Sequence, residues 1–170
     1  MRGRRMGMML LFALVIAIVV GFFALQIWAR TAPPSALGTE NGELMPCPDS
    51  PNCVSSYATD EEHGTEPLEL RGESASQESG EASSSSARDA IARARAVVES
   101  MPRTRITEER ADYLAAEFRS SVFGFVDDVE FLADEASGRL HIRSASRLGY
   151  SDMGANRERV EEIRRRYNDM

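Results

Sequence analysis

The longest apolar stretch of the chain lies near its beginning, where no residue between Arg5 and Arg30 is charged. This stretch of 24 residues would span about 36 Å as a helix, and the hydrocarbon core of a bilayer is about 30 Å thick. Gln26 is its one clearly polar residue, and Trp28 stands where an interfacial aromatic residue is expected. The pattern therefore predicts a membrane-spanning helix, with residues 6–29 in contact with lipid.

The charges beside this run predict its orientation. Arg2, Arg4 and Arg5 precede it, and the positive-inside rule then keeps the N-terminus in the cytoplasm. Everything after residue 30 would be extracytoplasmic, in the periplasm or outside the cell. The alternative is a cleaved signal peptide, which has a shorter apolar region and a cleavage site of small residues. Because the run is long and Arg30 stands where small residues are wanted, we favour a single-pass anchor.

Two segments after the anchor have no apolar periodicity. Residues 31–45 contain prolines, glycines and acids, and we predict an acidic, flexible stalk. Residues 71–86 are dominated by Ser, Glu and Gly, which cannot contribute to a core, and we predict a low-complexity insert. The expected organisation is an Arg cap and anchor (1–30), this stalk, and one domain over 46–170 that carries the insert.

Within that domain the hydrophobic period changes twice. Apolar residues at helical spacing between Ser86 and Met101 predict a helix that ends before Pro102. Alternation of period 2 predicts strands over 112–120, 125–133 and 139–147, with a short strand at 104–107 and a hairpin loop at 134–138. A last helical face is predicted from four apolar residues: Met153, Val160, Ile163 and Tyr167. This order predicts an α+β fold, with a small antiparallel sheet flanked by helices.

Matching apolar positions across the hairpins predicts a register. It sets Phe131 opposite Leu140 and Val129 opposite Ile142, and therefore places Glu130 opposite His141 and Asp128 opposite Arg143. The preceding hairpin would pair Phe118 with Phe125 and Leu114 with Val129. Asp127 then lies on the apolar face near Ala116, where it needs a partner, and we expect an Arg from beyond residue 143.

Composition limits the possible functions. The chain has 27 acidic and 20 basic residues, a net charge of −7, and every basic residue is Arg. This balance argues against a nucleic-acid binder, which needs a basic face. There is no nucleophile-elbow or phosphate-loop motif, and Ser55 and Ser56 have no obvious base near them in the sequence. We therefore expect no cofactor.

The only cysteines are Cys47 and Cys53, and in an extracytoplasmic domain they favour a structural disulfide. Free thiols, or redox or metal chemistry, are the alternatives. A redox pair usually has two intervening residues rather than five, and a metal site needs further ligands. His63 lies in an acidic linker and His141 on a strand, so we expect no metal.

Three motifs carry a resemblance to a known family: residues 46–56 (PCPDSPNCVSS), 124–131 (GFVDDVEF) and 143–157 (RSASRLGYSDMGANR). In this order they resemble the family called domain of unknown function 1499, over about residues 45–167. The resemblance implies a bacterial or plastid protein that is often associated with membranes. It implies no reaction and no catalytic residue.

The last of these motifs is the best candidate binding segment, because it leaves a strand and enters a helix N-terminus. Arg forks and hydroxyl groups there suit a phosphate or a carboxylate. The candidate ligand-binding residues are Arg143, Ser144, Ser146, Arg147, Tyr150, Ser151, Asp152, Asn156 and Arg157. The alternative is structural: the Arg residues pair with Asp127, Asp128 and Glu130, and Asp152 or Asn156 caps the helix.

Three function classes follow from these observations. We favour a non-enzymatic, membrane-anchored module that binds an anionic ligand, a lipid headgroup or a partner membrane protein through residues 143–157. The second class is an envelope hydrolase or transferase that uses Asp127, Asp128 or His141 with the Arg cluster. Adjacent Asp residues on a strand face opposite ways, which disfavours a facing carboxylate pair. The third class is a scaffold that has no binding pocket.

Overall fold

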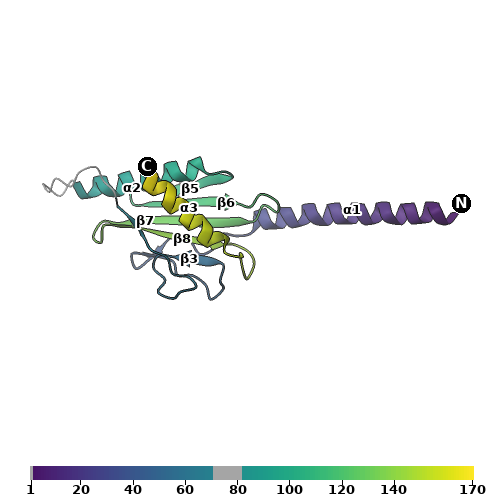
Figure 1. The fold of residues 1–170 in the computed structure, drawn as a ribbon, viewed down its shortest axis with the longest axis horizontal. Coiled ribbons are helices and arrows are strands. Elements are labelled where there is room, and N and C mark those ends of the chain that lie inside the picture. The colour runs from purple at the N-terminus through teal and green to yellow at the C-terminus, as the bar shows by residue number, and fades with distance from the viewer. Residues whose placement is uncertain (1, 71–81) are drawn as a thin grey trace.

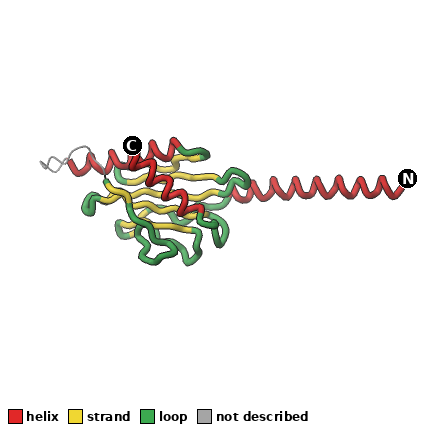
Figure 2. Tube along the Cα trace, in the orientation of Figure 1, coloured by secondary structure: helices red, strands yellow, loops and turns green. Residues whose placement is uncertain are grey.

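The computed structural model describes residues 2–70 and 82–170. A long helix, α1 (Arg2–Thr31), projects from an α+β domain, as Figure 1 shows. In the domain, α2 (Ala82–Ser100) and α3 (Ala155–Asp169) lie together on one face of an antiparallel sheet, which is clear in Figure 2. The predicted fold class is therefore confirmed.

The main sheet has the strand order β3-β8-β7-β6-β5, and the short strand β4 pairs with β8 as well. A separate two-stranded hairpin is formed by β1 and β2. The strands are β1 (Thr39–Glu40), β2 (Glu43–Leu44), β3 (Cys53–Ser55), β4 (Leu68–Glu69), β5 (Thr104–Glu109), β6 (Tyr113–Arg119), β7 (Val126–Asp134) and β8 (Arg139–Ser146).

The main core lies between the sheet and the two helices. Side chains of β6, β7 and β8, including Phe131 and Ile142, pack against apolar residues of α2 and α3. α2 begins at Ala82, four residues earlier than predicted, so the last residues of the predicted insert are helical; its positions 71–81 lie outside the described residues. α3 buries Val160, Ile163 and Tyr167 as predicted. Met153 is 97% exposed and precedes the helix, so its assignment to that face is wrong.

The predicted register is wrong by two residues in both hairpins. Phe131 lies opposite Ile142 rather than Leu140, and Glu130 lies opposite Arg143 rather than His141. In the preceding hairpin Leu114 lies opposite Phe131. A shift of two keeps every side chain on its predicted face, because strand side chains alternate with period 2.

The same shift changes the neighbours of both Asp residues. Asp128 lies opposite Ala145 rather than Arg143, and Val129 opposite Ser144 rather than Ile142. Asp127 lies opposite Phe118 rather than opposite Ala116, as the predicted register required. The faces could therefore be predicted from the sequence, whereas the cross-strand partners could not.

The second face of the sheet is covered by the segment after α1. We expected residues 31–45 to form a flexible stalk, but Leu44 is buried against Tyr113 and Leu132 of the sheet. The backbone amides of Ser35 and Gly38 donate hydrogen bonds to Asp128 and Glu130 of β7, at 3.1 Å and 2.7 Å. This segment is therefore a second layer of the domain.

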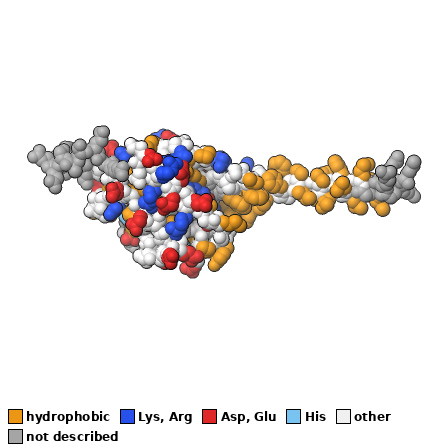
Figure 3. Space-filling view, viewed as in Figure 1, with side chains coloured by type: hydrophobic (Ala, Val, Ile, Leu, Met, Phe, Trp, Pro, Cys, Tyr) orange, Lys and Arg blue, Asp and Glu red, His pale blue; other side chains and the backbone are white. Residues whose placement is uncertain are grey.

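α1 has an apolar stretch, Met8–Thr31, that is long enough to cross a membrane. Its apolar side chains are exposed along its length, as Figure 3 shows. By length and composition this helix is either a membrane span or a signal sequence.

Glu117 of β6 gathers three guanidinium groups on the second face. Arg105 donates two hydrogen bonds to its carboxylate, and Arg119 and Arg147 donate one each, all within 3.1 Å. Burial alone would raise the pKa of Glu117, but these hydrogen bonds lower the pKa to about 2. A depressed pKa in the folded state contributes stability above the unfolded pKa of about 4.5, and that stability is lost as the pH falls towards 2.

We therefore expect Glu117→Gln to lower the free energy of unfolding by about 3 kcal/mol at pH 7. The difference between wild type and variant should shrink as the pH falls from 4.5 to 2, because the wild-type carboxylate becomes protonated over that range. Urea unfolding of the full chain in detergent micelles at several pH values measures this difference. A difference that stays constant down to pH 2 would contradict the assignment.

Candidate functional site

The candidate segment Arg143–Arg157 runs from β8 through a loop into α3. Arg143 is 1% exposed, and its Nη1 donates to Glu130 Oε2 at 2.8 Å. The other oxygen of Glu130 accepts from the Tyr113 hydroxyl at 2.7 Å and from the Gly38 amide. Arg143 is therefore part of an internal ion pair on the second face of the sheet.

Arg147 holds Asp128 with two parallel hydrogen bonds, at 2.9 Å and 2.7 Å. It also donates to Glu117 at 2.8 Å and to the backbone carbonyl of Ala32 at 3.2 Å. Asp128 accepts in addition from the amide and hydroxyl of Ser35. This buried pair therefore joins the sheet to the chain that leaves α1, and we call it the Asp128–Arg147 clamp.

On the helix side, Asn156 is the centre of a buried polar network. Its side-chain oxygen accepts from Ser144 at 2.6 Å, and its amide nitrogen donates to Ser146 and to the carbonyl of Asn52. Asp152 accepts from the backbone amide of Asn156 at 2.7 Å at the start of α3. These four candidates therefore fix β8, β3 and α3 to one another.

Arg159 completes this network, although it was not among the candidate residues predicted from the sequence. It donates to Ser144, to Asn156 and to Asp127. Asp127 thus has the partner that we expected from beyond residue 143. The available signal was helical spacing, since Arg159 lies three positions after Asn156 on α3.

Of the remaining candidates, only the loop residues are open to solvent. Arg157 donates to the carbonyls of Glu61, Glu62 and Gly64, and so it fastens the loop before β4. Tyr150 and Ser151 are exposed. The arginines expected to bind an anion thus have internal acceptors, and the exposed part of the segment is its loop.

The expected disulfide is present between Cys47 and Cys53, whose Cα atoms are 5.6 Å apart. His63 lies beside this loop: Nδ1 is 2.8 Å from Asp60, and Nε2 is 3.3 Å from the carbonyl of Ser50. Burial lowers the pKa of His63, but the hydrogen bonds to Asp60 and Ser50 outweigh it, and the net shift is upward. His63 therefore joins two loops.

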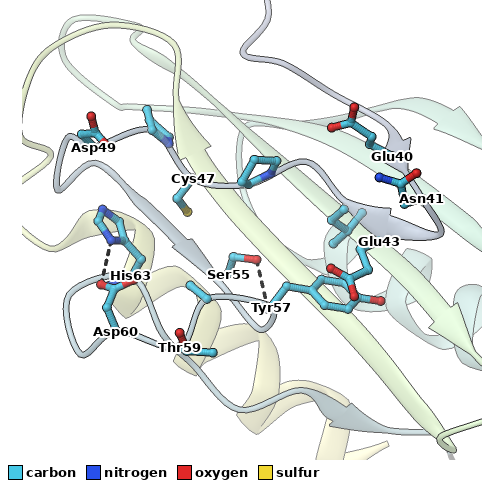
Figure 4. A pocket seen from close by; sticks show the side chains of 14 residues that line it. Glu40, Asn41, Glu43, Cys47, Asp49, Ser55, Tyr57, Thr59, Asp60 and His63 are labelled. Atoms are coloured by element: carbon cyan, nitrogen blue, oxygen red, sulfur yellow. Dashed lines mark hydrogen bonds and ion pairs between the residues drawn. The ribbon is translucent and has the colours of Figure 1, made fainter.

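A groove of about 590 Å³ runs between these loops and the β1–β2 hairpin. Figure 4 shows its lining, with His63 and Asp49 at one end, Glu40 and Asn41 at the other, and Tyr57 between them. Four acids also line it: Glu40, Glu43, Asp49 and Asp60. Among the described residues, no group of three or more His, Cys, Asp or Glu side chains has the arrangement of a metal site.

Ser56 is close to a base, contrary to our expectation. Its hydroxyl lies 3.0 Å from His141 Nδ1, and the imidazole stacks on Tyr57 at 3.9 Å between ring centroids. Burial lowers the pKa of His141, which favours the neutral ring. The Ser56 oxygen also accepts from the Ile142 amide. In the described part of the chain no carboxylate is hydrogen-bonded to His141, whereas the charges of Asp134 and Glu43 act on its ring.

The sequence did not indicate how closely α1 joins the domain. Gln26 donates to the carbonyl of Val122 in the β6–β7 loop at 3.0 Å, and Phe22 contacts Phe123 at 6.1 Å between ring centroids. Gly124 has a φ of +72°, and a Cβ there would lie 3.0 Å from Arg30 Nε. The loop and the last turns of α1 are therefore packed together.

Residues 43–166 match the family model described as a protein of unknown function (DUF1499). No match was found among curated proteins or among solved structures.

We expect Arg147→Met to lower the free energy of unfolding by about 3–5 kcal/mol, because Asp128 would stay buried without its partner. The matched control is Arg105→Met. Its side chain is 63% exposed and Glu117 keeps two other arginines, so about 0–1 kcal/mol should be lost. Urea unfolding of both variants in micelles measures the difference.

Adding Asp128→Asn to Arg147→Met should recover part of the loss, since the uncompensated charge is then removed. Equal, small losses in the two single variants would show that the Asp128–Arg147 clamp is not needed for the fold.

Proposed function

Because the chain belongs to the DUF1499 family, whose description names no reaction, we propose a function from its own structure. The protein is a single-pass membrane protein, with its N-terminus in the cytoplasm and its domain outside. The domain is a non-enzymatic module that α1 holds in a fixed orientation at the membrane surface, where it binds lipid headgroups or a partner membrane protein. The observation that carries this proposal is the packed junction between α1 and the β6–β7 loop.

The hydrogen bonds made by the polar side chains near the end of α1 support the anchor. Gln26 would be costly in lipid, but it donates to Val122 and its side-chain oxygen accepts from Arg30 at 3.3 Å. Thr31 donates to carbonyls of its own helix. A cleaved signal peptide has no need of such contacts with the mature domain. The Cys47–Cys53 disulfide is consistent with an extracytoplasmic domain.

We favour a binding role over catalysis because the candidate catalytic carboxylates are held in internal ion pairs. Asp127 pairs with Arg159 on the helix side, whereas Asp128 pairs with Arg147 on the second face. The two carboxylates therefore cannot act on one substrate. His141 is stacked on Tyr57, and among the described residues no carboxylate is hydrogen-bonded to its ring, although Asp134 and Glu43 act on it through their charge. Of the candidate binding segment, the loop with Tyr150 and Ser151 is the part that can reach a ligand.

We expect the protein in its native membrane to have the mass of the whole chain, 18.8 kDa, and to resist extraction at alkaline pH. External protease should reach the domain, and maleimide labelling should find free thiols only after reduction. A mass that lacks the α1 segment, together with a soluble domain, would identify a signal peptide and would contradict the proposal.

The control is a variant in which Arg2, Arg4 and Arg5 are changed to Glu. Because these charges set the orientation, the variant should be misoriented in part while it stays membrane-bound. Unchanged protease accessibility would show that another feature determines the topology.

A further inference from the structure

Outside α1, the exposed large apolar side chains are concentrated at one end of the domain. Among the described residues there are five, and four of them are Val122 (59% exposed), Phe123 (40%), Tyr150 (76%) and Met153 (97%). The fifth is Met170. We call the first four residues the apolar rim.

The apolar rim lies on two loops at the end of the sheet where α1 is attached. Val122 and Phe123 lie in the β6–β7 loop, beyond the pair Arg119–Val126. Tyr150 and Met153 lie in the β8–α3 loop, beyond the pair Asp127–Ser146. Both pairs are at the same end of the strands, and Figure 3 shows apolar side chains on the domain beside the base of α1. Solvent-exposed apolar surface of this kind marks an interaction site.

The position of Phe123 along α1 identifies the occupant. Phe123 contacts Phe22, which lies eight residues before Arg30, or about 12 Å along the helix. If Arg30 lies at the headgroups, Phe123 reaches below them, beside the lipid-facing surface of α1. The apolar rim is therefore continuous with the surface that α1 presents to the acyl chains.

Basic side chains lie at the same end. Arg30 packs against Gly124, and Arg103 and Arg119 are joined at the base of the β6–β7 loop, where Arg103 Nε donates to the carbonyl of Arg119 at 3.0 Å. Aromatic and apolar tips with arginine behind them suit the region between acyl chains and phosphate groups. Binding of a protein partner would not require the apolar rim to lie at the same depth along α1 as Phe22.

We propose that the apolar rim inserts into the outer leaflet of the bilayer that α1 spans, so that the domain contacts the membrane through two loops as well as through its helix. This inference rests on the proposed function, since α1 must remain in the membrane. It adds that the lipid itself is the binding partner of the exposed loop that carries Tyr150 and Met153.

Tryptophan fluorescence tests this proposal, because Trp28 is the only tryptophan of the chain. In a Trp28→Phe background, Phe123→Trp, Tyr150→Trp and Met153→Trp each place one reporter on the apolar rim. The matched control is Ser137→Trp, in the β7–β8 turn at the opposite end of the sheet. The full chain is reconstituted in vesicles of phosphatidylcholine with brominated acyl chains, which quench tryptophans that they touch.

We expect the reporter at position 123 to lose most of its fluorescence, those at 150 and 153 to lose a smaller part, and the control at 137 to lose none. Full fluorescence at positions 123, 150 and 153 would overturn the proposal, and the exposed loops would then be free for a protein partner. Tyr150→Trp changes an exposed residue, so it gives a result even if Phe123→Trp disturbs the junction.

The fluorescence of Trp28 in the unaltered chain shows whether a negative result concerns only the insertion of the apolar rim or also the proposed membrane anchor. Quenched Trp28 together with unquenched rim reporters would leave the anchor in place and reject the insertion of the apolar rim. Unquenched Trp28 would reject the anchor, and with it both proposals. Circular dichroism of each variant before reconstitution checks that the domain is folded.

Discussion

The Asp128–Arg147 clamp is the interaction on which the arrangement of helix and domain depends. Two buried charges are costly to remove from water, and they are stable here because every contact is a hydrogen bond of good length. Arg147 also donates to the carbonyl of Ala32, and Asp128 accepts from the amide of Ser35, so the clamp holds both ends of the segment 32–35 that follows α1. It therefore determines the direction in which the chain leaves the helix.

The rest of the second face extends the same arrangement. Glu130 with Arg143, and Glu117 with three arginines, continue the ion pairs on the second face of the sheet, and residues 32–44 cover Glu130 and Asp128. The planar guanidinium group carries five N–H donors in a rigid fork, so it can hold a carboxylate with two parallel hydrogen bonds and still donate to other acceptors, whereas a lysine has three donors and no such fork. A chain whose basic residues are all Arg can therefore bury several charges on one sheet. The segment 31–45 that packs on this face then needs few apolar residues.

Features that depend on neighbouring residues could be predicted from the sequence, whereas features that depend on contacts between distant residues could not. Alternation determined which face each strand residue occupies, and the clustering of polar residues in 143–157 identified the important segment. The register could not be read from alternation because it depends on the loops, which are residues 120–125 between β6 and β7 and residues 135–138 between β7 and β8, each with a glycine of positive φ, Gly124 and Gly138. Asp134 stabilises the second loop by accepting from the amides of Ala136 and Ser137. The role of residues 32–44 could not be predicted, since their partners lie about ninety residues away.

Two exceptions to the local pattern meet at the junction of α1 with the domain. Gln26 is polar within an apolar helix, and Val122 and Phe123 are apolar within an exposed loop. Taken separately, each would be unfavourable in its surroundings. Together they are complementary, because the loop carbonyl satisfies Gln26 while the loop side chains continue the apolar surface of the helix. A domain on a free stalk would need neither exception, and their combination supports the proposal that the domain lies against the membrane that α1 spans.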